Sequence, residues 1–286
     1  MLIQKSSGNL LHLIIVALFL TACAPTIIRY YPRVIEKSLT KKIQIIEVNL
    51  NESSSKETYL DLMKYKVQYA YGYLLERADR VYDDDYSEAI ILQDKAKLIF
   101  KEAIEIGLNQ LNTRYSSFNQ WLASEKGDQI SFTQKDTPYL YWLAAAYGGA
   151  IKSSRANPKW VIHLPKVGRL LEKAIEIEPN WNYGSLYSAM ISFTVSRPDP
   201  SINLRKTAQK YFDLALKASD GEDASPYLAF AENISIKEQN KTEFLHLTNT
   251  VLTMDIGQNP ELTLGNIIAQ ERARWLQSKL EDLFYE

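Results

Sequence analysis

The sequence contains few cysteines, histidines and glycines, and it has no excess of charge of either sign. Cys23 is its only cysteine, so no disulfide can form within one chain. The 33 basic residues almost balance the 34 acidic ones, whereas binding to nucleic acid normally needs a basic excess on one face. The low count of 11 glycines, beside many Ala, Leu, Ile, Glu and Lys, favours helices joined by short turns. We therefore expect a helical protein whose main partner is not nucleic acid.

The residues that usually carry catalysis or hold metals are also scarce. Beyond the N-terminal segment the only histidines are His163 and His246, which lie far apart, and no zinc-ligand spacing occurs. The run Asp83–Asp85 lacks the glycine and the final glutamate of a calcium loop, so it predicts a solvated turn or a helix cap. There is no glycine-rich phosphate loop and no G-x-S-x-G elbow. The sequence gives no sign of an enzyme, a cofactor or a metal site. Its carboxylates are numerous, but nothing selects one pair of them as a catalytic acid and base.

The N-terminus has the layout of an export signal. Lys5 supplies a weak positive charge, and the apolar run Leu10–Leu20 is too short for a comfortable membrane span. Small residues then precede the only cysteine in "Leu20-Thr21-Ala22-Cys23", which resembles a bacterial lipobox. We predict a lipoprotein signal peptide at 1–22. The alternative is an ordinary signal peptide followed by a chance cysteine.

Lipidation of Cys23 would tether the mature protein to a membrane. Acyl chains anchor because each buried methylene contributes about 0.8 kcal/mol, and several chains make release negligible. The following residues, 23–32, are predicted to form a lipidated tether. We expect a protein of the cell envelope that faces the periplasm. Ala24 slightly favours the outer membrane, because in enteric bacteria an aspartate at this place tends to retain lipoproteins in the inner one.

Helical periodicity covers most of the remaining chain. From Arg33 to Leu50 apolar residues recur every three or four positions, and a second helix is predicted from about Tyr59 to Tyr82. A third helix ends near Leu111, and later helices are bounded by segments that contain Pro, Gly or Asn. No convincing alternating strand pattern appears. The sequence predicts an all-α fold forming a single domain over residues 33–286.

Several of these helices resemble one another. Aligning them places Ala103, Ala174, Ala215 and Val251 in the same slot, at offsets of 71, 41 and 36 residues. The first offset is close to two periods of a tetratricopeptide repeat, about 34 residues each, and the others fit one repeat with a small insertion. The pattern predicts a tetratricopeptide-like solenoid of antiparallel helix pairs. The last helix is predicted to cap it with the apolar residues Ile267, Ile268, Trp275, Leu276, Leu280 and Leu283.

The partner helices of these pairs mix aromatic with small residues, as close helix packing requires. Most of the rings are expected in the core, because residues two apart on a helix point to different faces. Tyr71, Tyr141 and Tyr147 belong to the same aromatic-rich helices. Some rings are nevertheless expected to line a concave surface. The candidates for a groove that binds a ligand or partner are Tyr69, Tyr73, Tyr139, Trp142, Tyr187, Arg272 and Arg274.

Four stretches of the chain resemble one protein family. They are "VQYAYGYLLERADRV", "TPYLYWLAAAYGGAIKSS" with "LPKVGRLLEKAIEIEPNW", "SPYLAFAENISIKEQNKTEF", and "ELTLGNIIAQERARWLQSKLEDLFYE" at the C-terminus. The family is the TatT component of tetratricopeptide-repeat-associated TRAP transporters. Its C-terminal pattern, which generic tetratricopeptide repeats lack, appears here as Asn266, Ala269-Gln270, Arg272-Ala273 and Asp282-Leu283-Phe284.

The resemblance implies a non-catalytic periplasmic lipoprotein that binds a TRAP-type solute-binding protein and assists the uptake of a small ligand. It also implies a possible homo-oligomer. Where many family members carry a histidine and often a glutamate, this chain has Tyr187 and neutral neighbours, so its ligand is expected to differ. The alternative is a structural scaffold that organises envelope proteins without a small-molecule ligand.

The arginines near the C-terminus are too polar for the capping face alone. One of them is expected to pair with an acidic residue such as Glu232 or Glu271. Alternatively, it faces the concave surface and meets an anionic ligand or partner.

Overall fold

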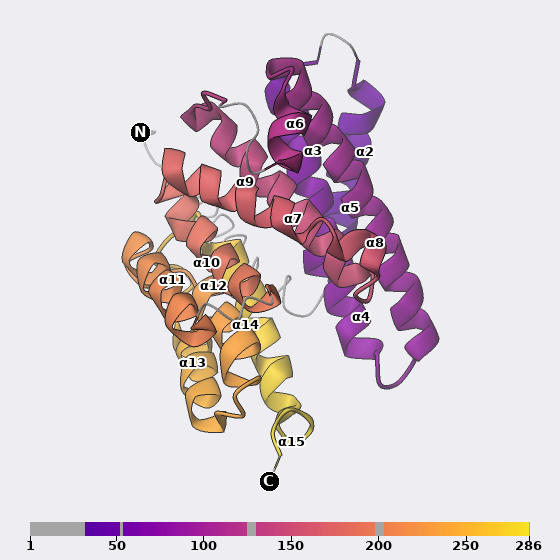
Figure 1. Ribbon diagram of the computed structural model, residues 1–286. Helices are drawn as coiled ribbons and strands as arrows, with labels where there is room; N and C mark the ends of the chain where they lie inside the picture. The colour runs from indigo at the N-terminus through magenta and orange to yellow at the C-terminus, as the bar shows by residue number, and fades with distance from the viewer. Residues whose placement is uncertain (1–31, 52–53, 125–129, 198–202, 286) are drawn as a thin grey trace, which may run out of the picture.

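The computed structural model describes residues 32–51, 54–124, 130–197 and 203–285. The predicted signal peptide at 1–22, Cys23 and almost all of the tether lie outside these residues. Every regular element of the described ranges is helical, and none of them is a strand (Figure 1). The all-α prediction is therefore confirmed. Within the same ranges, no helix is both long and apolar enough to cross a bilayer.

The elements follow one another in chain order with short connections. They are α2 (Pro32–Asn49), α3 (Lys56–Tyr69), η1 (Ala70–Leu75), α4 (Glu76–Val81), α5 (Tyr86–Arg114), α6 (Phe118–Ala123), η2 (Gln134–Asp136), α7 (Thr137–Ser153), α8 (Pro158–Val161), α9 (Leu164–Ile177), α10 (Trp181–Ser196), α11 (Leu204–Ala218), α12 (Ser225–Phe230), η3 (Ala231–Ser235), α13 (Lys241–Thr253), α14 (Thr263–Ser278) and α15 (Leu280–Leu283). The segments η1 and η3 are π-helical and continue α3 and α12, while η2 is a short 3-10 turn.

Local signals in the sequence explain several helix ends. Asp85, the last residue of the acidic run, accepts a hydrogen bond from the backbone N–H of Glu88 at 2.9 Å and so caps α5, which confirms the helix-cap alternative. Asn203 and Asn240 cap α11 and α13 in the same way. The predicted helices at 33–50 and from about 59 to 82 correspond to α2 and to the continuous helix α3–η1–α4.

The helices pack as successive pairs. They are α3–η1–α4 with α5, α7 with α9, α10 with α11, and α12–η3 with α13. Ala103, Ala174, Ala215 and Val251, which the alignment placed in one slot, lie on the second helix of each pair and are all fully buried. The three alanines among them let neighbouring helices approach closely.

Two glycines are needed for this close packing. A Cβ atom on Gly149 of α7 would come within 2.3 Å of the Phe100 ring of α5. Gly184 lies at a kink in α10 with φ of 81°, a conformation that glycine adopts readily, and a Cβ there would lie 2.8 Å from Ala218. The contact of α5 with α7 and that of α10 with α11 therefore each depend on the absence of a side chain at one position.

Two hydrophobic clusters divide the molecule into lobes. The first lobe contains α2 to α9, and the second contains α11 to α15, with α10 contributing side chains to both cores. The last long helix, α14, packs against α12 and α13 and, on another side, forms ion pairs with α4. In an open solenoid each repeat touches only its neighbours. Here the end of the chain returns to one of the first helices, so α14 joins the lobes as well as covering the second core (Figure 1).

Candidate functional site

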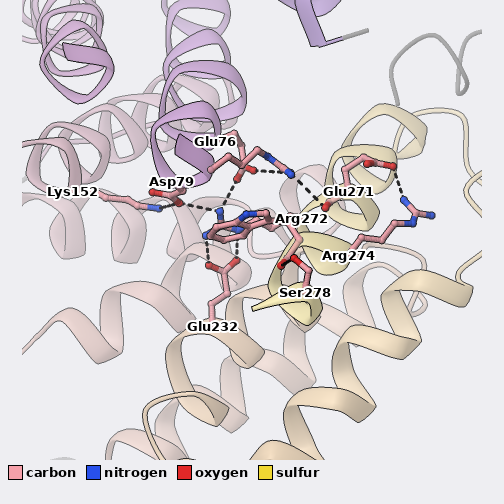
Figure 2. A network of polar contacts seen from close by, with 10 residues as sticks. Glu76, Asp79, Lys152, Glu232, Glu271, Arg272, Arg274 and Ser278 are labelled. Carbon is pink, nitrogen blue, oxygen red and sulfur yellow. Dashed lines mark hydrogen bonds and ion pairs between the residues drawn. The ribbon is translucent and has the colours of Figure 1, made fainter. Parts of the chain in front are cut away.

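A buried ionic cluster marks the place where the two lobes meet. Arg272 of α14 is only 8 % exposed, and it contacts three carboxylates from two other elements, α4 and η3. Its guanidinium lies 2.7 Å from Glu232 of η3, 2.9 Å from Asp79 of α4 and 3.4 Å from Glu76 of α4. Figure 2 shows these carboxylates arranged around the guanidinium. We call Arg272, Glu76, Asp79 and Glu232 the Arg272 cluster.

The π-helical segments help to place two of the acidic residues. Glu76 follows η1 directly, and Glu232 lies within η3. A π-helical turn holds one residue more than an α-helical turn, so it changes the face on which the following side chains point. The two segments lie in the first and the fourth helix pair. The residue after η1 and a residue within η3 each supply a carboxylate to the same arginine.

Further charged and aromatic groups surround the cluster. Trp275, one helical turn beyond Arg272, has its ring centroid 4.5 Å from the guanidinium carbon. Arg80 lies 3.4 Å from Glu76, and Lys152 of α7 lies 3.9 Å from Asp79. The carboxylates are therefore neutralised by cations of both lobes.

Burial and charge oppose each other in this cluster. Burial by itself would lower the pKa of Arg272, but the hydrogen bond from Arg272 to Glu232 and the other carboxylates raise that pKa above its ordinary value. Burial raises the pKa of Glu76, an effect that the positive charges of Arg272 and Arg80 reduce. Arg272 thus stays charged, and its pairing with carboxylates is what allows a guanidinium to be buried here.

The other polar residues of the C-terminal pattern also fasten neighbouring elements. The side chain of Asn266 donates to the carbonyl of Glu222 at 2.7 Å and accepts from the N–H of Ala224 at 2.9 Å. Gln270 donates to the carbonyls of Val251 and Met254, both at 3.1 Å, and so satisfies the end of α13. The pattern that the sequence shows at its C-terminus therefore holds the second lobe together.

The two arginines predicted for a groove have different surroundings. Arg272 pairs with Glu232 as expected, and Arg274 lies 2.5 Å from Glu271. The expectation that an arginine pairs with one of these two glutamates is confirmed for both. Arg274 keeps 39 % of its side chain exposed, whereas Arg272 is enclosed between the lobes.

Most of the aromatic residues predicted for the groove lie in the core. Tyr69 and Tyr73 are buried and stack on each other with centroids 5.8 Å apart. Tyr139 is buried and donates its hydroxyl to the carbonyl of Lys56. Tyr187 is buried and stacks with Tyr211. The same-face pairing of Tyr69 with Tyr73 is thus used for packing.

Trp142 is the predicted groove ring that keeps part of its surface exposed. Its ring meets that of Tyr141 edge-on, with the ring centroids 5.0 Å apart. The centroid of Tyr141 in turn lies 4.8 Å from that of Trp181 at the start of α10. All three rings are half-buried. Burial, with a small contribution from the charge of Asp223, raises the pKa of Tyr141 to about 12. The rings belong to α7 and α10, and Asp223 belongs to the loop before α12, so these residues come from both lobes. We call Tyr141, Trp142, Trp181 and Asp223 the junction aromatic group.

Asp223 is itself unusual in this group. It is 4 % exposed, and burial raises its pKa although it accepts a hydrogen bond from the N–H of Ser225 at 2.9 Å. A buried carboxyl near half-exposed rings combines an apolar surface with a polar group that can orient a bound molecule.

Sequence reasoning did not single out Glu76, Asp79, Trp181 or Asp223. The charge pattern of one helix gives no signal for a partner that lies 193 positions away, as Asp79 does from Arg272. Trp181 and Asp223 stand in segments that read as helix boundaries, and only the packing of α7 against α10 explains the proximity of Trp181 to Tyr141. Across the described ranges, no group of three or more His, Cys, Asp and Glu side chains could hold a metal ion.

Comparison with known proteins relates the chain to a family and to a curated protein. A model of the family described as "TRAP transporter T-component" matches residues 31–284. An uncharacterised protein of Treponema pallidum (strain Nichols) is 20 % identical over 260 residues, which cover 88 % of this chain and 80 % of that protein. The family match therefore includes both lobes, the Arg272 cluster and the C-terminal pattern.

Proposed function

We propose a function from the premise that this chain belongs to the TRAP transporter T-component family. In this proposal it is a lipid-anchored protein that binds a TRAP-type solute-binding protein and assists the uptake of a small ligand. The family is one of transporter components, so its members have a role in TRAP transport. In this proposal the protein is non-catalytic and faces the periplasm, and Cys23 carries its acyl anchor.

The observation that carries the proposal is the extent of the family match, residues 31–284, which spans all the helices from α2 to α15. The architecture supports it further. Two helical lobes are joined through a buried ionic cluster, and such a framework can present a fixed surface to another folded protein. A rigid surface loses little conformational entropy when it binds.

We assign the contact with ligand or partner to the junction aromatic group. Half-buried Trp and Tyr rings supply a large apolar area and lose few side-chain rotations on binding, which is why such residues dominate many interfaces. The buried carboxyl of Asp223 adds a negative charge that is close enough to act on Tyr141. Of the residues predicted for a groove, Trp142 belongs to this surface.

The test is a crosslinking experiment on the lipidated protein in its own envelope. A photoreactive phenylalanine derivative replaces Trp142, and the crosslinked partners are identified by mass spectrometry. Trp160 of α8 is the matched control, because it is also a half-buried tryptophan of the first lobe and lies outside the junction aromatic group. The proposal expects a TRAP-type solute-binding protein from position 142 and much less of it from position 160.

Recovery of envelope-assembly proteins alone, in cells that express the solute-binding protein, would overturn this assignment and support the scaffold function. Recovery of the solute-binding protein from both positions equally would leave the partner in place but remove the junction aromatic group as its contact surface.

A further inference from the structure

Helix α2 turns its carboxylates towards the first lobe. Glu47 lies 2.5 Å from Lys66 of α3, a lysine that is 4 % exposed and also pairs with Glu102 at 2.6 Å. Glu36 lies beside the hydroxyl of Tyr73, whose pKa is raised by burial and by this carboxylate. Lys42 lies over the ring of Tyr65 at 4.9 Å. These contacts, with the buried Ile43, fix which face of α2 is turned inwards.

The opposite face of α2 combines lysines with aliphatic side chains. Lys37, Lys41, Ile45 and Val48 follow one another at intervals of four, four and three residues, so they form one stripe along the helix. Ile45 is 51 % and Val48 is 77 % exposed. Lys37 and Lys41 are also exposed, and neither has an ion pair with a carboxylate of the described ranges. We call these four residues the α2 stripe.

The position of α2 brings this stripe near the proposed anchor. Helix α2 lies at the edge of the first lobe and packs against α3 and η1 (Figure 1). Residues 24–31 separate Cys23 from the first residue of the helix. Nine residue steps span at most about 30 Å when fully extended. An acyl group on Cys23 would therefore keep the beginning of α2 within this distance of the membrane surface.

We propose that the α2 stripe lies against the headgroups of an anionic phospholipid bilayer. Lys37 and Lys41 would contact lipid phosphates, and Ile45 and Val48 would enter the boundary between headgroups and acyl chains. Helices that lie in this interface combine basic with apolar side chains in this way, and lysines extend their charged ends to the headgroups. The inference rests on the proposed lipidation of Cys23.

A bilayer suits the stripe better than a second copy of the chain. Two copies facing each other through this stripe would bring unpaired lysines together, which is unfavourable. An anionic surface instead supplies the missing negative charge to both lysines, and the short tether favours the encounter because it raises the local concentration. Contact through α2 would also orient the molecule, with the first lobe nearest the membrane.

The single cysteine makes a direct test possible. Once Cys23 is acylated, the substitution Val48→Cys introduces the only free thiol, which can carry a nitroxide spin label. The lipidated full-length protein is reconstituted in vesicles that contain phosphatidylcholine with phosphatidylglycerol, or phosphatidylcholine alone. Accessibility of the label to oxygen and to a water-soluble nickel chelate reports its depth. Leu264→Cys, at a 47 % exposed leucine of the second lobe, is the matched control.

The proposal expects a several-fold loss of nickel accessibility at position 48, and not at position 264, in vesicles with the anionic lipid. The loss should disappear with phosphatidylcholine alone and in the variant Lys37→Glu/Lys41→Glu. Equal accessibility at both positions in every vesicle would overturn it. Protection that varies with the protein-to-lipid ratio and ignores lipid charge would also overturn it and indicate a second copy.

Mass spectrometry of the same sample separates this inference from its premise. An acylated Cys23 with an exposed position 48 rejects only the contact of the α2 stripe with the membrane and leaves the proposed transport function intact. A mature protein without an acyl group rejects both the anchor and the inference.

Discussion

Replacing Arg272 by methionine should be among the most destabilising single changes in this protein. Methionine has a similar length and can occupy the space beside Trp275, so the packing loss is small. The main cost is electrostatic, because Glu232, Asp79 and Glu76 lie 2.7, 2.9 and 3.4 Å from the guanidinium and lose it together.

The size of the effect follows from this geometry. Removing one partner of a buried ion pair typically costs about 3–5 kcal/mol, because the other charge stays buried without compensation. Here Arg80 and Lys152 remain near two of the carboxylates and offset part of the loss. We therefore expect the lower end, about 3 kcal/mol at pH 7.

The dependence on pH has a definite sign. Burial already raises the pKa of Glu76, and Arg272 opposes this effect. Without Arg272 the folded-state pKa of Glu76 rises further above its unfolded value. A group whose folded pKa is raised destabilises the folded state as the pH rises through that pKa, and the loss is relieved at lower pH. The difference in stability between wild type and variant should therefore shrink as the pH falls from 7 to 5.

Urea unfolding, followed by circular dichroism at several pH values, measures this difference. Two variants serve as controls. Arg274→Met removes a half-exposed arginine that pairs with Glu271 at the surface and should cost at most about 1 kcal/mol. Glu232→Gln, added to Arg272→Met, removes one uncompensated charge and should recover part of the stability. A loss below about 1 kcal/mol for Arg272→Met, or a loss independent of pH, would refute the reasoning.

Other substitutions test the packing and the polar contacts. Gly149→Ala should lower the stability by about 1–3 kcal/mol, because the added methyl overpacks against Phe100. Gly265→Ala, in the exposed part of α14 where a Cβ meets nothing within 4 Å, should raise the stability by up to about 1 kcal/mol. Thermal unfolding compares the two variants. Gln270→Leu should cost about 1–3 kcal/mol, because the carbonyls of Val251 and Met254 lose their donor, and hydrogen exchange should show the end of α13 opening first. Burial alone would raise the pKa of Asp136, but hydrogen bonds from Tyr115, Thr133 and Arg114 lower it. Asp136→Asn should therefore destabilise the protein at neutral pH. The difference in stability between wild type and variant should vanish as the pH falls through that lowered pKa. Urea titrations at pH 7 and below 4 check this; a constant difference would contradict it.

Patterns that are local along the chain predicted much of the fold. The apolar spacing between Arg33 and Leu50 predicted α2 to within a residue or two at each end. The alignment predicted Ala103, Ala174, Ala215 and Val251 as equivalent positions, and the structure buries all four. The C-terminal pattern indicated the family that the comparison confirms.

Which aromatic rings keep an exposed surface was harder to predict, because the direction of a ring depends on packing in three dimensions. Periodicity identified Tyr69 and Tyr73 as a same-face pair, and the structure stacks them within the core. Trp142, in contrast, stays half-buried beside Tyr141 and Trp181. The sequence could list the candidate rings, and the helix crossings decided which of them reach the surface.

By itself, the sequence determined the helices, their pairing along the chain, and the placement of small residues where helices cross. Only the tertiary structure decided how α4 and α14 meet. Asp79 and Arg272 are 193 positions apart, and their contact depends on the summed angles of all the intervening helices together with the phase changes at η1 and η3. No local pattern encodes such a sum, because each helix specifies only its own faces, whereas a buried arginine needs carboxylates that several helices deliver to one point.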